Sequence, residues 1–223
     1  MPAAVLWDMD GTLVDTEPYW IATEYELADR HGGRWSEADA LALVGNDLLS
    51  SARYIREHMG IDREPEEIVE ELLDGVVSRV RDVVPWRPGA VELVLALREA
   101  GVPLALVTMS YDRFVAPILA QLPPETFRVV VTGDRVERGK PHPEPYLTAA
   151  AALGLDPADC LAIEDSNTGA KSAEAAGCLV LVVENHVPVI PGERRVFADT
   201  LTGIDLAAVW GRRPCPPAAG DAG

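Results

Sequence analysis

The sequence of 223 residues predicts an α/β protein, with a doubly wound parallel-sheet core and an inserted all-helical domain. Two observations predict the sheet: short apolar runs recur along the chain, and helical patterns separate them. Because most of these runs do not alternate with polar residues, they are typical of strands buried on both faces. A third observation predicts the insert, since helical patterns follow one another between residues 16 and 85 without a convincing strand.

The predicted core alternates strands and helices in chain order. The strands are expected at Ala3–Trp7, Pro103–Val107, Arg128–Val131, Cys160–Ile163 and Leu179–Val183. The helices that connect or precede them are expected at Gly89–Ala100, Asp112–Leu122, Pro143–Leu153 and Asn167–Ala176. A strand followed by a helix and another strand forms a crossover connection, so this order favours a parallel sheet covered by helices on both faces.

The predicted insert consists of consecutive helices. They are expected at Glu17–Arg30, Ser36–Val44, Leu48–His58 and Pro65–Val84. Ser36 followed by Asp39 is typical of a helix start, and Pro85 ends the last helix. We therefore assign residues 1–15 and 86–210 to the core and 16–85 to the insert. Residues 211–223 are rich in Pro, Gly and Ala, and we expect a disordered tail.

The composition limits the partners and the location of the protein. A net charge of −17 would repel a nucleic acid or an anionic membrane, so we expect neither as a partner. No apolar run approaches the roughly 18 residues of a membrane-spanning helix, and residues 1–7 lack the positive flank of a signal peptide. Three cysteines without a close pair suggest no disulfide framework. We expect a soluble cytoplasmic protein.

The most informative motif is DMDGTLVDT at residues 8–16, where the first predicted strand ends. Ligands of open parallel sheets bind beyond the carboxyl ends of the strands, so Asp8 and Asp10 are expected to face such a crevice. An Asp-x-Asp-Gly stretch alone is also typical of a turn, in which its polar groups satisfy the local backbone. The complete string is far more specific.

Three further sites lie at predicted strand ends or in a loop. Thr108 ends the second strand, Lys140 lies in a GKPHP loop, and Glu164 and Asp165 close the fourth strand. Each has an ordinary structural explanation on its own: a hydroxyl at a strand end, a solvated loop charge, or an acidic helix cap. The four sites together, in this order, are much harder to explain in that way.

Together these motifs resemble those of the haloacid dehalogenase superfamily, in the proper order and across nearly the whole chain. DMDGTLVDT resembles the first signature of that superfamily, Thr108 its phosphate-binding hydroxyl residue, and Lys140 its phosphate-clamping lysine. Glu164 and Asp165 resemble its metal-binding acidic pair. The resemblance implies a Rossmann-like core, and it implies that the insert is a helical cap that closes over the site.

The resemblance further implies a Mg²⁺-dependent phosphatase. Asp8 would attack phosphorus to form an aspartyl-phosphate, and Asp10 would act as general acid and then as general base. The metal would be held by the side chains of Asp8 and Asp165 and the backbone carbonyl of Asp10, with Glu164 close by. Oxygen ligands of this kind are those that Mg²⁺ prefers.

The same resemblance implies a phosphate pocket that offsets the acidic surface. Lys140 would supply a second cation, while Thr108 and backbone N–H groups at Gly11 and Met109 would hold phosphoryl oxygens. Such a pocket is needed because the overall charge of −17 repels a phosphorylated substrate.

Substrate choice is expected in the cap, with Glu17, Trp20, Asn46 and Asp47 as candidate contacts. For Trp20, packing in the core of the cap explains an aromatic residue equally well. A small phosphorylated metabolite is implied, but a sugar phosphate, glycerol phosphate, nucleotide or phosphoglycolate would all satisfy the motifs. We expect a monomer only because many relatives with this type of cap work as monomers.

Two alternatives remain. A β-phosphoglucomutase-like isomerase shares all four motifs but returns the phosphoryl group to sugar. Such mutases commonly have a histidine where this chain has Trp20, and they use basic cap residues to bind a second phosphate. In this chain Arg53 could supply one positive charge, but both lysines, Lys140 and Lys171, lie outside the cap. The phosphatase is therefore favoured. A catalytically silent binding module is disfavoured because every catalytic position is filled.

Overall fold

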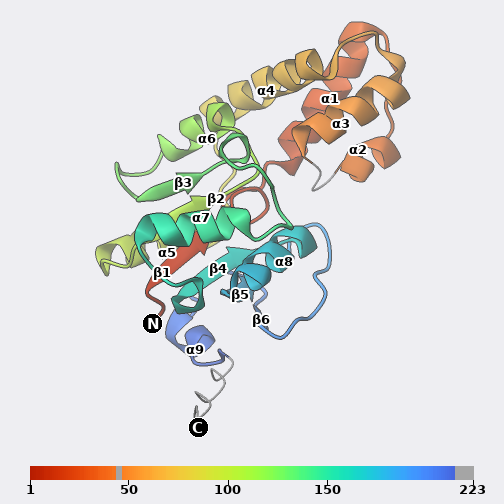
Figure 1. Cartoon of the computed structure of the whole chain (residues 1–223). Coiled ribbons are helices and arrows are strands. Elements are labelled where there is room, and N and C mark those ends of the chain that lie inside the picture. The colour runs from red at the N-terminus through yellow and green to blue at the C-terminus, as the bar shows by residue number, and fades with distance from the viewer. Residues whose placement is uncertain (44–46, 214–223) are drawn as a thin grey trace.

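The structure is a computed structural model that describes residues 1–43 and 47–213. These residues form a six-stranded sheet in the order β3-β2-β1-β4-β5-β6, in which every neighbouring pair is parallel (Figure 1). The strands are β1 (Ala4–Trp7), β2 (Leu104–Val107), β3 (Val129–Val131), β4 (Cys160–Glu164), β5 (Leu179–Val182) and β6 (Arg195–Phe197). The predicted parallel sheet is confirmed.

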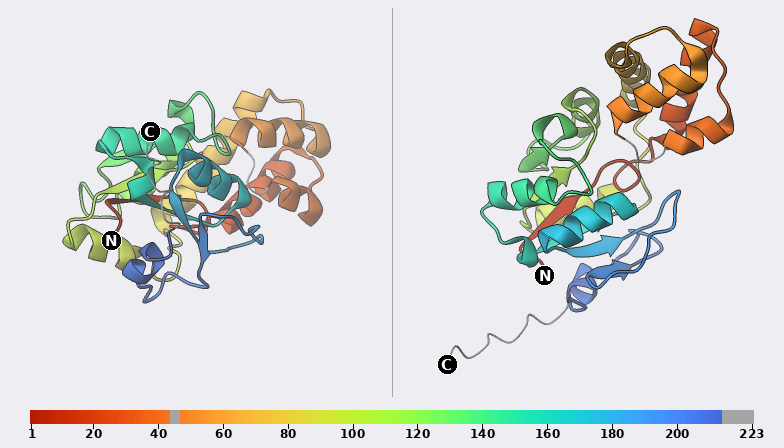
Figure 2. Two further views of the ribbon diagram at one scale, coloured as in Figure 1. Left: turned by 60° about the horizontal axis from the view of Figure 1, so that its bottom comes forward. Right: turned by 45° about the vertical axis from the view of Figure 1, so that its right-hand side comes forward.

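Helices cover both faces of the sheet, as Figures 1 and 2 show. The core helices are α5 (Ala90–Glu99), α6 (Asp112–Leu119), α7 (Glu144–Leu153), α8 (Asn167–Ala176) and α9 (Leu206–Trp210). Successive residues of a strand point to opposite faces, so Val5 and Trp7 join one buried cluster with α5, α6 and α9. Ala4 and Leu6 join the other cluster, with α7 and α8. This alternation explains why the strands are apolar throughout.

The insert contains α1 (Glu17–His31), α2 (Glu37–Leu43), α3 (Leu48–Ile55) and α4 (Pro65–Asp82). The predicted helix start at Ser36 is present: its N–H donates to the Asp39 carboxylate (3.0 Å), and the Asp39 N–H donates to its Oγ (3.2 Å). The predicted helix 48–58 changes into a π-helical turn, Arg56–Gly60, and the last helix ends at Asp82. Val44, the predicted end of the second helix, lies outside the described residues.

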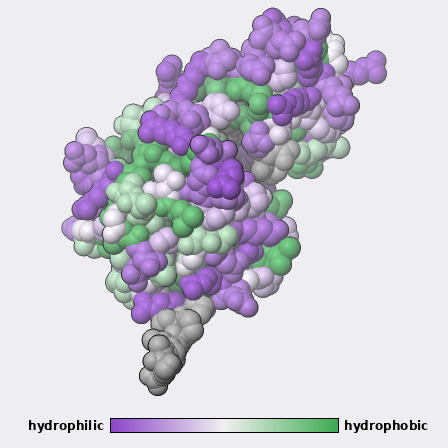
Figure 3. Space-filling model, viewed as in Figure 1, coloured by the Kyte–Doolittle hydropathy of each residue, from purple (hydrophilic) through white to green (hydrophobic). Residues whose placement is uncertain are grey.

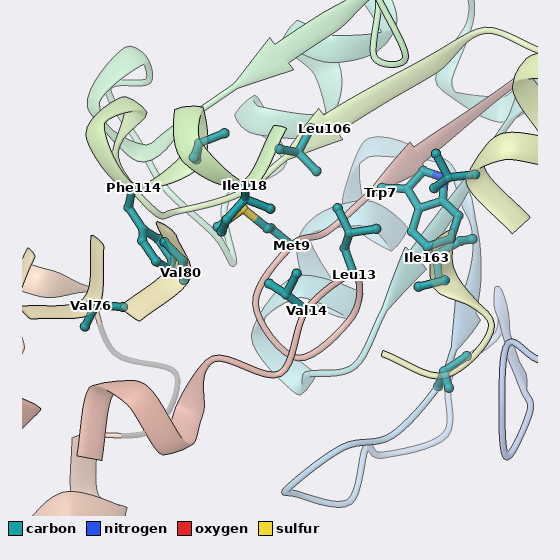
Figure 4. Close-up of a cluster of buried hydrophobic side chains, with 14 of the residues drawn as sticks. Trp7, Met9, Leu13, Val14, Val76, Val80, Leu106, Phe114, Ile118 and Ile163 are labelled. Atoms are coloured by element: carbon teal, nitrogen blue, oxygen red, sulfur yellow. The ribbon is translucent and has the colours of Figure 1, made fainter. Parts of the chain in front are cut away.

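The insert is docked on the core through α4 and α6. Val76 and Val80 of α4 lie in one buried cluster with Phe114 of α6 and Met9 (Figure 4). On the surface, Arg113 of α6 forms ion pairs with Glu70 and Asp74 of α4. The hydrophobic contact fixes the position of the insert beyond one end of the sheet, where Figure 2 shows it.

Two short elements at the C-terminal end were not predicted, β6 and α9. Only Val196 of β6 is buried, and α9 has five residues, so neither leaves a long periodic pattern. Gly211–Arg213, the start of the predicted disordered tail, instead form a turn, with the Arg213 guanidinium over the Trp210 ring at 4.9 Å. Residues 214–223 lie outside the described residues, so disorder there stays a prediction.

The surface is mostly hydrophilic on the face drawn in Figure 3, with apolar side chains in scattered patches. Within residues 1–43 and 47–213, no helix combines the length and the apolar character needed to cross a membrane.

Candidate active site

The site lies at the carboxyl ends of the central strands. Asp8 follows β1, Thr108 follows β2, and Glu164 is the last residue of β4. Because these strands are parallel neighbours, their ends meet at one edge of the sheet, the edge that faces the insert in Figures 1 and 2. Lys140 reaches the same edge from the loop between β3 and α7.

A cavity of about 690 Å³ opens between this edge and the insert. Five of the residues predicted to do the chemistry or to hold the metal line it: Asp8, Asp10, Thr108, Lys140 and Asp165. Gly11 and Met109 line it as well, and so do the predicted cap contacts Glu17, Trp20 and Asp47. Asn46, the other predicted cap contact, lies outside the described residues.

Lys140 forms the positive centre of the site. Its side chain is 5% exposed, and Nζ donates hydrogen bonds to Asp8 Oδ1 (2.6 Å), Glu164 Oε1 (2.7 Å) and the Val107 carbonyl (2.9 Å). Tyr146 also donates to Glu164 Oε1, at 2.6 Å. Burial lowers the pKa of Lys140, but Asp8 and Glu164 more than offset burial and hold that pKa above its ordinary value. The ammonium group therefore stays charged.

Glu164 is fully buried and does not line the cavity. Its carboxylate lies behind Lys140 and accepts hydrogen bonds from Lys140, Tyr146 and Ser166 (3.3 Å). A Cβ atom at Gly169 would lie 1.9 Å from Glu164 Oε1, so a glycine is required beside it. Glu164 therefore holds Lys140 in place from behind, between the sheet and α8.

The carboxyl groups at this edge can hold a metal ion. Oxygens of Asp8, Glu164 and Asp165 lie within 4.8 Å of one another, and Asp8 Oδ2 is buried without a hydrogen-bond partner among the described residues. Burial raises the pKa of Asp8 to about 7 despite Lys140, and it raises the pKa of Asp165 well above its ordinary value. Carboxylates that burial makes hard to ionise are stabilised by a divalent cation, and oxygen donors suit Mg²⁺.

Gly11 allows the first motif to pass beside this acidic group. Its φ of +89° is a left-handed conformation that favours glycine, and a Cβ atom there would lie 1.9 Å from Asp165 Oδ2. Thr12 approaches the same carboxylate, with its Oγ1 3.4 Å from Asp165 Oδ1. The glycine of the motif is therefore required both by the turn and by the position of Asp165.

Asp10 has a different environment from Asp8. Thr16 Oγ1 donates to Asp10 Oδ1 and Ser110 Oγ donates to Asp10 Oδ2, both at 2.6 Å, with Thr108 Oγ1 at 3.4 Å. Burial raises the pKa of Asp10, while the hydroxyl bonds from Ser110 and Thr16 act in the opposite direction. One carboxyl is thus paired with an ammonium group and the other with hydroxyls, an arrangement that allows two roles.

Sequence reasoning missed several residues that shape the site. Thr16 is the last residue of the first motif, and Ser110 lies two residues after Thr108. A second hydroxyl so close to Thr108 was the only feature of the sequence that pointed to Ser110. Tyr146 carried no such signal, because an aromatic residue in an apolar helix is usually a core residue. Arg53, considered as a phosphate ligand, is exposed and does not line the cavity.

Comparisons with known proteins agree with this geometry. The family model of the haloacid dehalogenase-like hydrolases matches residues 2–177. Hexitol phosphatase A of Escherichia coli is 36% identical over 184 residues, which cover 80% of this chain and 81% of that protein. N-acetylmuramic acid 6-phosphate phosphatase of Pseudomonas aeruginosa is 36% identical over 185 residues, 78% of each chain.

A solved structure, CbbY from Rhodobacter sphaeroides in complex with phosphate, has the same fold with a TM-score of 0.82. It is 25% identical and covers 91% of this chain and 96% of its own. The family model spans most of the chain, including the acidic cluster, Lys140 and the whole insert. The chain therefore belongs to the haloacid dehalogenase-like hydrolase family.

Proposed function

We propose that this protein is a cytoplasmic, Mg²⁺-dependent phosphatase of small phosphorylated metabolites that works through an aspartyl-phosphate. The observation that carries the proposal is Asp8: its Oδ1 accepts from Lys140, while its Oδ2 is buried without a partner beside Asp165. A carboxylate oriented in this way beside a cation is suited to attack an electrophilic phosphorus. The phosphatase names of the relatives support the same reaction.

In the proposed first step, an Asp8 oxygen forms a bond to phosphorus, and the bond from phosphorus to the leaving oxygen breaks. Asp10 gives its proton to that oxygen, so the product leaves as an alcohol. In the second step Asp10 takes a proton from water, the water oxygen bonds to phosphorus, and inorganic phosphate leaves Asp8. The two steps restore both side chains.

Asp10 must exchange a proton between these steps. Burial favours its protonated form, and the hydroxyls of Thr16 and Ser110 favour its ionised form. Because these influences oppose each other, Asp10 can be present in either state as the reaction requires. The two hydroxyls also fix the orientation of its carboxyl group.

Positive charge is required before Asp8 can approach a phosphate. Lys140 supplies it from the protein, and its bonds to Glu164 and the Val107 carbonyl fix the ammonium beside Asp8. Mg²⁺ held by Asp8, Asp165 and the Asp10 carbonyl would neutralise further charge on the phosphoryl oxygens. Thr108 lines the same end of the cavity and would contact a phosphoryl oxygen.

The mutase alternative is less well supported. A mutase must hold a bisphosphate, yet among the described residues no Lys or Arg of the insert lines the cavity. Arg53 is exposed, and Trp20 stacks edge-on against Phe114 at 5.3 Å. Incubation with β-glucose 1-phosphate and a bisphosphate primer separates the two reactions: glucose 6-phosphate without free phosphate would favour the mutase.

Replacing Asp8 tests the proposal. With Mg²⁺ and p-nitrophenyl phosphate, Asp8→Asn should release no phosphate above background, whereas Asp62→Asn, an exposed control in the insert, should retain wild-type rates. Asp10→Asn should slow the second step, so that quenched samples contain a phosphorylated peptide that includes residue 8. Hydrolysis by Asp8→Asn at wild-type rates would refute the nucleophile, and a phosphorylated peptide from another segment would relocate it.

A further inference from the structure

The part of the cavity formed by the insert carries polar groups that the proposed chemistry does not use. Glu17, Trp20 and Glu24 of α1 line it, and their spacing of three and four residues places them on one stripe of the helix. Asp47, which caps the start of α3, and Leu48 and Ser51 of α3 line it as well. This half of the cavity, which we call the cap pocket, would surround the leaving group of a substrate.

Two of these side chains are buried with unused hydrogen-bonding capacity. Glu24 is 4% exposed; its Oε2 accepts from Trp35 Nε1 (3.0 Å), and its Oε1 accepts from no described residue. Ser51 is 7% exposed, and its hydroxyl has no partner among the described residues. Buried polar groups that line a cavity and lack partners are normally satisfied by water or by a ligand. Both side chains can therefore bind a polar ligand group.

The charges of the cap pocket select against an anionic ligand. The insert contributes Glu17, Glu24 and Asp47 as its ionisable residues there and, among the described residues, no Lys or Arg. His186 of the core also lines the cavity, close to Glu17 and paired with Asp15. A carboxylate or second phosphate on the leaving group would meet these carboxyl groups without a lysine or arginine of the insert to pair with. Burial raises the pKa of Glu24 to about 8, so its carboxyl carries a proton at neutral pH. A neutral carboxyl both donates and accepts hydrogen bonds, as an alcohol hydroxyl does.

The depth of the pocket indicates the length of the ligand. Thr16, which binds Asp10, precedes Glu17, and Glu24 lies seven residues further along α1, about 10 Å at 1.5 Å per residue. This backbone separation sets a scale of about 10 Å for the cavity along α1, which an extended chain of about eight bonds matches at about 1.2 Å per bond. Eight bonds lead from phosphorus to the far hydroxyl oxygen of a linear six-carbon polyol phosphate. Glycerol phosphate offers only five.

We infer, on the basis of the proposed phosphatase function, that Glu24 and Ser51 bind hydroxyl groups of an uncharged, polyhydroxylated leaving group of about six carbons. Glu24 accepts from and donates to a distal hydroxyl, with Trp35 fixing its carboxyl group. Ser51 of α3 binds another hydroxyl. The substrate class is thus a sugar or polyol monophosphate without a further negative charge.

A matched substrate series tests this assignment. Values of kcat/KM for phosphate release with Mg²⁺ are measured for sorbitol 6-phosphate, glycerol 3-phosphate, 6-phosphogluconate and p-nitrophenyl phosphate. Sorbitol 6-phosphate should exceed both glycerol 3-phosphate, which is too short, and 6-phosphogluconate, which has the same length but a carboxylate, by at least roughly tenfold. Glu24→Leu should bring the sorbitol-to-glycerol ratio close to one, and Glu24→Gln, which keeps a hydrogen-bonding group, should preserve most of it.

Two further variants complete the design. Ser51→Ala, a small change that keeps α3 intact, should lower the sorbitol-to-glycerol ratio even if Glu24→Leu fails to fold. Glu26→Leu lies on the exposed face of α1, where Glu26 pairs with Arg79, and should leave the ratio at its wild-type value. Equal kcat/KM for the three natural esters, or an unchanged ratio in both Glu24→Leu and Ser51→Ala, would overturn the assignment. Absence of hydrolysis of every ester, including p-nitrophenyl phosphate, would instead refute the phosphatase function.

Discussion

Replacing Glu24 by glutamine should change how the stability of this protein depends on pH. Burial raises the pKa of Glu24 to about 8 in the folded protein, against an ordinary value of 4.5. Between these values the unfolded chain has lost the proton while the folded chain still holds it. The folded state then binds more protons, so the contribution of Glu24 to stability, fully present below pH 4.5, is lost as pH rises towards 8.

The size of this effect follows from the two pKa values. Each unit of difference corresponds to about 1.4 kcal/mol of unfolding free energy. The interval from 4.5 to about 8 therefore allows a loss on the order of 5 kcal/mol. Glutamine has nearly the same shape, can accept the Trp35 hydrogen bond through its carbonyl oxygen, and does not titrate. Glu24→Gln should thus become progressively more stable than wild type as pH rises.

Urea unfolding of both proteins at several pH values between about 5 and 8 measures the difference directly. The advantage of Glu24→Gln should increase by up to about 1.4 kcal/mol per pH unit across this window. Glu26→Gln, on the exposed face of the same helix, serves as control, and its difference from wild type should not grow with pH. If the curves of wild type and Glu24→Gln run parallel, Glu24 ionises normally and the neutral carboxyl that we assign to the cap pocket is wrong.

Three further predictions concern the acidic edge of the sheet. Lys140→Met should lower the unfolding free energy by about 3–5 kcal/mol, because Asp8 and Glu164 lose a buried cation; chemical denaturation measures this, and a loss below about 1 kcal/mol would contradict it. Mg²⁺ at about a hundred times its Kd should raise the unfolding free energy by about 2.7 kcal/mol, and Asp165→Asn should remove most of that gain in the same titration. Gly11→Ala should reduce kcat/KM at least roughly a hundredfold, since its Cβ would displace Asp165; activity close to wild type would show that the loop adapts.

The fold could be predicted because the central strands are buried on both faces. β1, β2, β4 and β5 are buried at every position, so each leaves an apolar run that the sequence displays. β6 pairs only with β5 at the edge of the sheet and buries Val196 alone, which leaves no such run. Backbone pairing, rather than apolar burial, defines this strand, and pairing partners are not visible in one sequence.

The side chains that converge on the cavity could be predicted, but their hydrogen-bond partners could not. Asp8, Asp10 and Lys140 belong to motifs whose order along the chain is informative. Ser110 contacts Asp10, 100 positions away, and Tyr146 contacts Glu164, 18 positions away. Only the folded chain brings these pairs together. Predicting the cavity residues of the insert required knowing which face of each helix turns towards the cavity. Glu24 lies on the same face of α1 as Glu17 and Trp20, but it was not predicted from the sequence.

Met9 lies between Asp8 and Asp10 in the sequence and is fully buried in the cluster that also holds Phe114 and Val80 (Figure 4). The backbone that carries Asp8 and Asp10 is therefore anchored to the same hydrophobic contact that joins the insert to the core. A bulky substitution in that contact, or a rotation of the helical insert, would therefore displace the carboxyl groups of Asp8 and Asp10. Substitutions at Val80 or Phe114 should for this reason behave as activity mutations, although neither residue lines the cavity.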